Sequence, residues 1–362
     1  MARFLLCHAP FGSGHTVAKE AIEEAISKNH SDAECISINV FSYLPTWMEK
    51  GILKSYLWIL AHCPSIYRRG YRLSNRQKSG TILMRLISPL MKARLMAAVR
   101  AYRPDAVICT HATPTVLAGD LAEKGLLRAP IFAVVTDYVV HRLWMHGGVS
   151  RYFVAHKELI DRFRACGFSG DNVTVSGIPV RARFCPREDI REEGRVLVMG
   201  GGLGLMNLMP ILRAMSRMSL PVTLHIITGS EIGRKRALAM TRNYSYKIIV
   251  DGYSRCVDEA MRRASVLITK AGGVSVAEAL AIGVPLILFG SLAGQEEGNT
   301  AFLAGAGAAL TANDEEELYQ SLRRLLARTD DSWAKIAAAQ EKLRRPYAAQ
   351  MIAEEIWKMI KQ

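Results

Sequence analysis

Several familiar signatures are missing from this sequence of 362 residues. Its seven cysteines are odd in number and widely scattered, with no Cys-x-x-Cys pair. Such cysteines argue against a disulfide framework and a structural zinc site, and they fit a reducing compartment. No apolar run reaches about 18 residues, so we expect no membrane-spanning helix. The short apolar run after Arg3 is too brief for a signal peptide and predicts a first β-strand.

Acidic residues are scarce relative to basic ones: 33 Asp and Glu stand against 47 Lys and Arg, a net charge of +14. Most of the excess lies between Phe41 and Arg103, where twelve Lys and Arg face a single acid, Glu49. Apolar residues, Trp47 and Trp58 among them, alternate with these charges, so the segment is amphipathic as well as basic. This mixture favours an anionic membrane surface over nucleic acid. The alternative is a helix pair whose charges are simply solvated.

The organisation of the chain predicts two α/β domains. Its length exceeds what one ordinary core can hold, and an apolar content of 50% indicates a folded protein. Short apolar runs alternate with helical stretches, which predicts parallel sheets covered on both faces. The expected strands are Arg3–His8, Glu34–Val40, Ala106–Cys109, Ile131–Val135, Arg151–Ala155, Val196–Met199, Leu224–Thr228, Lys247–Val250, Val266–Thr269 and Pro285–Phe289. We expect domains at 1–180 and 181–345, and a C-terminal helix at 346–362 that packs back across the hinge.

Two glycine-rich turns follow predicted strands. The first, Phe11 to His15, has Val17 where a dinucleotide-binding motif needs its third glycine. The second, Gly200 to Gly204, fails as a dinucleotide motif for the same reason, and it lacks the Gly-Lys-Ser/Thr of a Walker A loop. Each leads into a predicted helix, whose free N–H groups and positive end suit a phosphate. A purely structural turn is the alternative reading of the first.

The block from Thr269 to Asn299 is the most specific pattern. It combines a strand, a glycine turn and a helix that carries Glu278 near its start. A carboxylate there can accept hydrogen bonds from both hydroxyls of a ribose while the turn amides hold a phosphate. Gln295 and Glu296 offer amide and carboxylate groups that suit the hydroxyls of a hexose.

In order and spacing, these motifs resemble those of the GT-B glycosyltransferases. Within them, the chain is similar to the family of monogalactosyldiacylglycerol synthases and processive diacylglycerol glucosyltransferases, and more distantly to the N-acetylglucosaminyltransferase that forms lipid II. The resemblance rests on Gly12-Ser13-Gly14-His15, Ser55-Tyr56, Tyr67, Thr136-Asp137 with His141 and Trp144, Gly177-Ile178-Pro179-Val180-Arg181, the loop 200–204 and the block 269–299. It covers nearly the whole chain.

The resemblance implies an α/β GT-B fold, with two Rossmann-like doubly wound domains facing a central cleft. It implies inverting transfer of a hexose from UDP-glucose or UDP-galactose to diacylglycerol, which makes a β-glycosyl diacylglycerol. The enzyme would be cytoplasmic and peripherally attached to the inner face of the cell membrane, with no nucleic-acid partner. Alternatives are a lipid II N-acetylglucosaminyltransferase, a nucleotide-sugar epimerase, or a non-catalytic binding module.

The resemblance also assigns roles to residues. For the general base we favour His15, with Asp137 as runner-up and His141 or a bridging water as further possibilities. Because the sequence has no Asp-x-Asp pair, we expect no metal ion and no cofactor, and helix N-termini with Arg181 would hold the diphosphate. We expect six further histidines to be structural: His8, His30, His62, His146, His156 and His225.

The expected binding residues form two sets. The donor set is Gly14, Arg181, Gly201, Gly202, Gly204, Gly252, Tyr253, Lys270, Ala271, Gly272, Gly273, Ser275, Glu278, Gln295, Glu296 and Asn299. The acceptor and membrane set is Trp47, Tyr56, Trp58, Arg68, Arg69, Arg72, His141 and Trp144. For Trp144, packing in the domain core is the alternative.

Overall fold

The computed structural model describes the whole chain except residues 77–81, 188–189, 201–205, 328–329 and 362. At residues 61, 76 and 82–87 it describes the backbone but not the side chains. The described backbone separates into two compact units. Unit 1 comprises Met1–Ala182, Ala293–Gln295 and Tyr347–Gln362, and unit 2 comprises Arg183–Leu292 and Glu296–Pro346. Each unit contains one parallel sheet of six strands, as the alternation of apolar runs predicts.

The sheet of unit 1 has the order β2-β1-β3-β4-β5-β6. Its strands are β1 (Ala2–His8), β2 (Ala33–Asn39), β3 (Ala106–Cys109), β4 (Ile131–Val134), β5 (Arg151–Val154) and β6 (Val173–Val175). The five strands predicted for this half are confirmed to within about two residues at their ends. The short strand β6 was not predicted, because three residues are too few to show a period.

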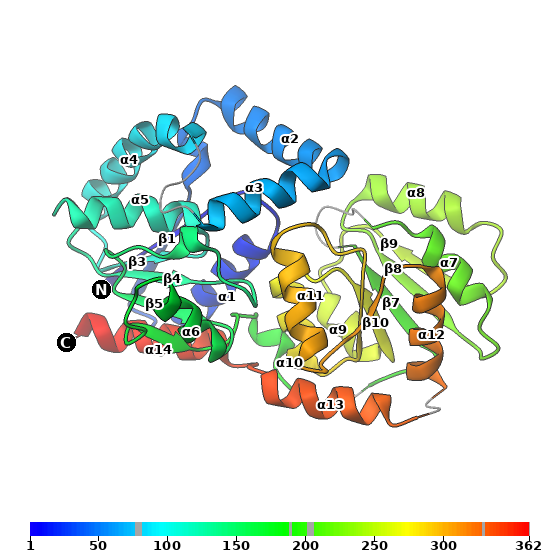
Figure 1. Cartoon of the computed structure of the whole chain (residues 1–362). Coiled ribbons are helices and arrows are strands. Elements are labelled where there is room, and N and C mark those ends of the chain that lie inside the picture. Colours follow the sequence, from blue (N-terminus) through cyan, green and yellow to red (C-terminus); the bar gives the residue numbers. More distant parts are fainter. Residues whose placement is uncertain (77–81, 188–189, 201–205, 328–329, 362) are drawn as a thin grey trace. The chain divides into compact units, whose positions relative to one another are not determined.

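Unit 1 also contains helices, several of which pack on the sheet. They are α1 (Gly14–Asn29), α2 (Thr46–His62), α3 (Pro64–Arg76), α4 (Ile82–Tyr102), α5 (Ala112–Glu123), α6 (Glu158–Ala165) and α14 (Ala348–Lys361), with short 3-10 helices η1 (Val40–Tyr43) and η2 (Arg142–Trp144). The C-terminal helix α14 belongs to unit 1, where it lies beside α1 (Figure 1). Ile352 and Ile356 of α14 join Phe4 and Ile22 in one buried core.

The sheet of unit 2 has the order β12-β11-β10-β7-β8-β9. Its strands are β7 (Arg195–Met199), β8 (Thr223–Ile227), β9 (Lys247–Asp251), β10 (Val266–Thr269), β11 (Leu286–Phe289) and β12 (Leu310–Ala312). Its helices are α7 (Met209–Ser216), α8 (Glu231–Thr241), α9 (Val257–Arg263), α10 (Gly273–Ile282), α11 (Gln295–Gly305), α12 (Glu315–Leu326) and α13 (Ser332–Leu343), preceded by η3 (Ala182–Phe184). The five strands predicted for this half are confirmed, and β12 was not predicted.

Both strand orders reverse direction once along the chain. In unit 1 the reversal lies between β1 and β3, and in unit 2 it lies between β7 and β10. Loops leave neighbouring strands in opposite directions at such a point, and the crevice they open is where open α/β sheets bind ligands. The fold therefore directs attention to the segments after His8 and Cys109 in unit 1 and after Thr269 in unit 2.

No helix in the described ranges combines the length and the apolar character needed to cross a bilayer.

Candidate functional site

In unit 1 the reversal point is occupied by polar side chains from several elements. His8 ends β1, Thr110 and His111 follow β3, and Thr136 follows β4. Because the strands are parallel, their carboxyl ends share one edge of the sheet, and α1 begins there with Gly14 and His15. Ser13 makes no side-chain cap, so the start of α1 stays open to a ligand.

His15 is held in one tautomer by its neighbours. Its Nδ1 lies 2.8 Å from the carbonyl oxygen of Thr110 and 2.9 Å from Oγ1 of Thr136. A carbonyl oxygen can only accept, so Nδ1 carries the proton and Nε2 of the neutral ring keeps its lone pair. The hydroxyl of Thr110 in turn donates to the backbone oxygen of His15 at 2.9 Å. This arrangement leaves Nε2 as the basic atom.

The histidines at this edge are all neutral at physiological pH. Burial lowers the pKa of His15 to about 4, against the smaller opposing effect of its bond to Thr110. Burial also lowers the pKa of His8, helped by the positive charge of Lys19. The pKa of His111 falls well below its ordinary value through burial and then through the neighbouring His15. A neutral imidazole has a lone pair on one ring nitrogen, so it can accept a proton without first losing one.

His111 is a residue of this site that the sequence analysis did not select. It caps the N-terminus of α5, where its Nδ1 accepts a hydrogen bond from the backbone N–H of Thr113 at 3.1 Å. Its ring meets the ring of His15 edge-to-face, with centroids 4.6 Å apart. Its position shortly after the predicted strand Ala106–Cys109 was a signal in the sequence. Its closeness to the first glycine turn follows only from the pairing of β1 with β3.

Asp137 follows Thr136 in the loop 135–150, with its side chain partly buried. Its carboxylate lies near three tyrosines. Together with burial, which is the larger cause, the negative charge of Asp137 raises the pKa of Tyr71 and of Tyr138, and it contributes to the raised pKa of Tyr67. Two of these phenols, Tyr67 and Tyr71, come from α3, so that helix forms one wall of the Asp137 environment.

His141 joins the loop 135–150 to α3. Its Nδ1 accepts from the backbone N–H of Leu143 at 3.1 Å, so the proton of the neutral ring sits on Nε2. That Nε2 lies 3.2 Å from the carbonyl oxygen of Tyr71 and 3.1 Å from Oγ of Ser74. Both ring nitrogens are thus engaged within the protein. Trp144 is only 5% exposed, so most of its ring packs in the interior.

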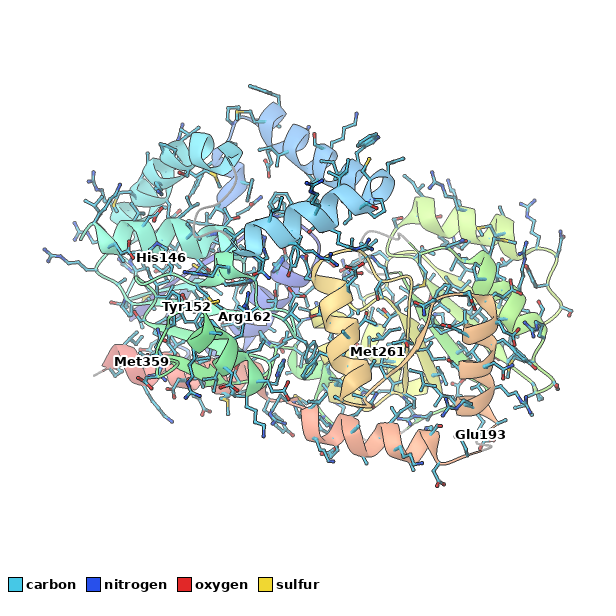
Figure 2. The ribbon with its side chains drawn as sticks, in the orientation of Figure 1. His146, Tyr152, Arg162, Glu193, Met261 and Met359 are labelled. Atoms are coloured by element: carbon cyan, nitrogen blue, oxygen red, sulfur yellow. The ribbon has the colours of Figure 1, made fainter. Side chains whose placement is uncertain are left out.

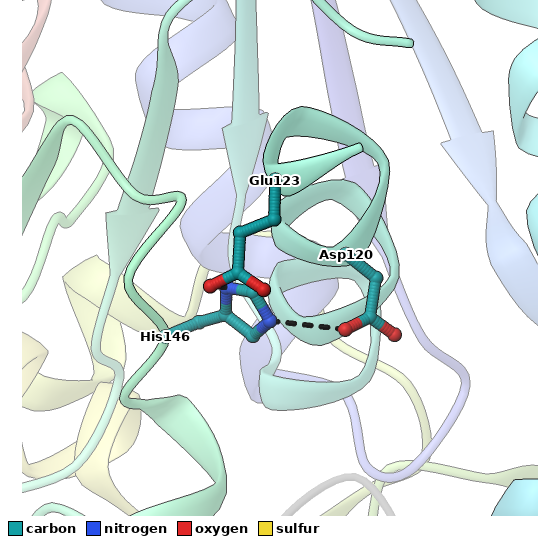
Figure 3. Close-up of side chains that lie close together, drawn as sticks. All are labelled: Asp120, Glu123 and His146. Atoms are coloured by element: carbon teal, nitrogen blue, oxygen red, sulfur yellow. Dashed lines mark hydrogen bonds and ion pairs between the residues drawn. The ribbon is translucent and has the colours of Figure 1, made fainter. Parts of the chain in front are cut away.

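A second anchor holds the far end of that loop. Figure 3 shows Asp120 and Glu123 of α5 around the ring of His146. Nε2 of His146 lies 3.0 Å from Oδ1 of Asp120, and its Nδ1 accepts from the backbone N–H of Gly148 at 3.1 Å. Lys92 forms an ion pair with Asp120. Because protein groups already engage these atoms, the cluster anchors the loop rather than offering a metal site.

Tyr152 reinforces that anchor from the adjacent strand β5, and Figure 2 labels it beside His146. Its hydroxyl accepts from the backbone N–H of His146 at 2.6 Å and donates to the carbonyl oxygen of the same residue at 3.0 Å. The loop that carries Asp137 is therefore tied down at His141 and again at His146.

The basic segment forms α2, α3 and α4, and several apolar side chains of α2 and α3 are exposed. Trp47 is 76% exposed, Trp58 55%, Ile66 65% and Leu73 50%. The basic face is defined here by these four residues and by the exposed Lys50, Lys54, Arg69 and Arg72 of α2 and α3. Tyr56 and Arg68 are half-buried, and the Tyr56 ring lies 5.2 Å from Phe11 in the first glycine turn.

In unit 2 the reversal point is occupied by the start of α10. Gly272 is its N-cap and provides no side-chain cap, so the first N–H groups of the helix remain available to an anion. Glu278 lies in the second turn and is only 6% exposed. The ribose role of Glu278 and the phosphate role of this helix start stay predictions.

Other donor residues surround that helix. Lys270 is 5% exposed, and its Nζ lies 3.8 Å from Oε1 of Glu296, whose Oε2 accepts from the backbone N–H of Leu292 at 2.7 Å. Asn299 is fully buried and donates to the carbonyl oxygen of Ala271 at 2.9 Å, which joins α11 to the turn before α10. Gly273 is buried and Ser275 partly exposed.

The remaining expected donor residues lie farther along the chain. Gly252 follows β9, and its carbonyl oxygen accepts from the backbone N–H of Gly229, while Tyr253 is 76% exposed. Arg181 and Gln295 group with unit 1, where a guanidinium nitrogen of Arg181 lies 3.6 Å from a carboxylate oxygen of Glu20. Gly201, Gly202 and Gly204 lie outside the described residues.

Comparisons with known proteins match the two halves separately. Residues 15–180 match the monogalactosyldiacylglycerol (MGDG) synthase family, and residues 195–355 match the glycosyltransferase family 28 C-terminal domain. The processive diacylglycerol beta-glucosyltransferase of Bacillus subtilis (strain 168) is 27% identical over 381 residues, covering 98% of this chain and 95% of that protein. The enzyme of the same name from Bacillus pumilus (strain SAFR-032) is 25% identical, with coverages of 98% and 94%.

Solved structures agree on the fold. MurG of Acinetobacter baumannii superposes with a TM-score of 0.67 at 17% identity, and the match covers 99% of this chain and all of that one. The expected GT-B architecture and the expected family are thereby confirmed. The chain belongs to the GT-B glycosyltransferases that join an MGDG-synthase domain to a family 28 C-terminal domain.

Proposed function

We propose that this chain transfers a hexose from a UDP-sugar to the primary hydroxyl of diacylglycerol, with inversion, at an anionic membrane surface. The observation that carries the proposal is the tautomer of His15, whose Nδ1–H is committed to Thr110 so that Nε2 is a free base. The relatives are processive diacylglycerol beta-glucosyltransferases, which favours diacylglycerol as acceptor and glucose as the hexose.

In this reaction Nε2 of His15 takes the proton of the acceptor hydroxyl. The hydroxyl oxygen forms a bond to the anomeric carbon while the bond from that carbon to the diphosphate breaks, and UDP leaves with the electron pair. One in-line displacement inverts the anomeric centre, so no glycosyl-enzyme is needed. A pKa of about 4 makes the imidazole a weak base when no substrate is bound.

The donor would bind to unit 2. The open start of α10 would receive a phosphate, and buried Glu278 would accept hydrogen bonds from the ribose hydroxyls. Lys270, next to the same turn, adds positive charge that favours departure of the diphosphate. We propose that these groups act without a metal ion.

The basic face would bring the enzyme to its acceptor. Lys and Arg side chains each gain about 1 kcal/mol near an anionic leaflet, and Trp47 and Trp58 would insert shallowly. We therefore place the enzyme in the cytoplasm, attached peripherally to the inner face of the membrane.

The test is an assay with each of three donors, UDP-glucose, UDP-galactose and UDP-N-acetylglucosamine, and diacylglycerol in vesicles rich in phosphatidylglycerol. We expect glycosyl diacylglycerol and one equivalent of UDP from at least one hexose donor. Epimerised nucleotide sugar, or transfer to a polyprenyl-linked acceptor alone, would replace this proposal by the corresponding alternative.

A further inference from the structure

Two neutral imidazoles at the reversal point of unit 1, His15 and His111, carry their protons on different ring nitrogens. His15 donates through Nδ1 to the oxygen of Thr110, so its Nε2 is an acceptor. His111 accepts through Nδ1 from the N–H of Thr113, so in the neutral ring its Nε2 is a donor. Both assignments follow from partners that can play one role only, a carbonyl oxygen in the first case and a backbone amide in the second.

Neither Nε2 atom is engaged by a residue that the structure describes. No described residue forms a hydrogen bond to Nε2 of His15 or of His111. Neither atom belongs to the fully buried polar atoms that lack a partner. The two rings are in contact, with centroids 4.6 Å apart and planes at 89°. A free acceptor and a free donor are therefore offered from adjacent rings on two different elements, α1 and the cap of α5.

We propose that His111 is a second catalytic histidine whose Nε2–H donates a hydrogen bond to the oxygen of the acceptor hydroxyl while Nε2 of His15 removes its proton. The inference rests on the transfer reaction proposed above. The proton passes from that oxygen to His15, the oxygen bonds to the anomeric carbon, and the donor's phosphate oxygen keeps the electrons of the broken bond. His111 keeps its own proton throughout.

A hydrogen bond from His111 would stabilise the negative charge that develops on the acceptor oxygen. As the proton leaves, the oxygen becomes more negative, and a fixed N–H donor stabilises it more in the transition state than in the ground state. The same bond orients the hydroxyl, so that its proton points to His15 and a lone pair remains for the anomeric carbon. Burial keeps the pKa of His111 low, so the ring stays a neutral donor with its tautomer set by Thr113.

Two variants separate this role from simple capping of α5. In His111→Asn the side-chain oxygen can replace Nδ1 as the cap acceptor, because Asn is among the best N-cap residues, but no donor reaches the position of Nε2. In His111→Gln the longer amide can present an N–H near that position, but Gln is not a favoured N-cap residue. A capping role and a catalytic role therefore predict opposite rankings of the two variants.

We expect His111→Asn to keep near-normal thermal stability and UDP affinity but to lose about 10²-fold in kcat, and His111→Gln to be the less stable and the more active of the two. Wild-type activity is measured first in the diacylglycerol assay, because its absence for every donor refutes the transfer reaction itself. If wild type is active and His111→Asn matches its kcat, or if His111→Gln is the less active variant, His111 is only a cap. The double variant with His15→Ala should lose much less than the product of the two single losses, since the pair acts on one oxygen.

Discussion

The carbonyl oxygen of Thr110 lies 2.8 Å from Nδ1 of His15 and so determines which nitrogen of that ring is basic. Thr110 follows β3 and His15 opens α1, so the contact depends on β3 lying next to β1 in the sheet. The contact therefore leaves Nε2 as the basic atom of the residue that the sequence analysis favours as general base.

Replacing that base should affect turnover and not donor binding. We expect His15→Ala to lower kcat by roughly 10²–10⁴-fold, because a positioned general base contributes about that much. UDP affinity, measured by calorimetry, should stay within about twofold, because the ribose and phosphate contacts proposed for the donor come from unit 2. Asp137→Asn is the comparison: if it loses turnover to the same extent while His15→Ala remains near normal, Asp137 is the base.

Acid should destabilise the protein through His15. The unfolded chain binds this proton below about pH 6.5 and the folded one only below about pH 4. The contribution of His15 to the free energy of unfolding is therefore complete above pH 6.5, falls between pH 6.5 and 4, and is constant below pH 4. Urea denaturation at pH 7.0 and 4.5 should show a smaller loss for His15→Gln than for wild type, by up to about 3 kcal/mol. Equal losses would contradict the low pKa.

Glu278 should control donor affinity. Glu278→Ala removes up to two charge-assisted hydrogen bonds to a ribose, each worth roughly 1.5–3 kcal/mol, so the Kd for UDP should rise at least tenfold. Glu259→Ala, which removes an exposed carboxylate of α9 in the same unit, is the control and should leave the Kd unchanged. A folded Glu278→Ala protein with the wild-type Kd would remove the ribose assignment.

Membrane binding should depend on the basic face and on salt. Vesicles rich in phosphatidylglycerol should pellet the protein, neutral vesicles should do so poorly, and 1 M salt should release most of it because the screening length falls from about 10 to 3 Å. The combined variant K50E/K54E/R69E/R72E should abolish pelleting and keep UDP affinity. The control K235E/R236E/R242E/K247E makes the same charge change at exposed positions of unit 2. If the control fails to pellet and the first variant pellets normally, the lipid surface is on unit 2.

Removal of divalent metal should not slow the reaction. We expect chelation with EDTA to leave kcat within about twofold, because helix N-termini and Lys270 are proposed to offset the charge of the diphosphate. Activity that vanishes with EDTA and returns with Mg²⁺ or Mn²⁺ would show that a metal ion is needed.

The sequence by itself was enough for the fold and for locating the proposed donor motif along the chain. Buried parallel strands are continuous apolar runs bounded by turn residues, so strands such as β3, β7 and β10 were predicted to within a residue. Glu278 lies in the second turn of α10, only a few residues after the glycine turn, so local sequence spacing alone places it near the start of that helix. Strands of three residues, β6 and β12, carry no such pattern and were not predicted.

Only the tertiary structure revealed the side-chain arrangement on which the proposed acceptor-side chemistry rests. His111 is 96 positions from His15 along the chain, and no local period relates them; only the order β2-β1-β3 brings their rings into contact. The roles of His141 and Trp144 were equally out of reach, because a ring whose nitrogens bind Leu143 and Tyr71 looks the same in sequence as a ring open to a ligand. Residue type and spacing report local geometry, whereas protonation state and burial depend on neighbours that are distant in the chain.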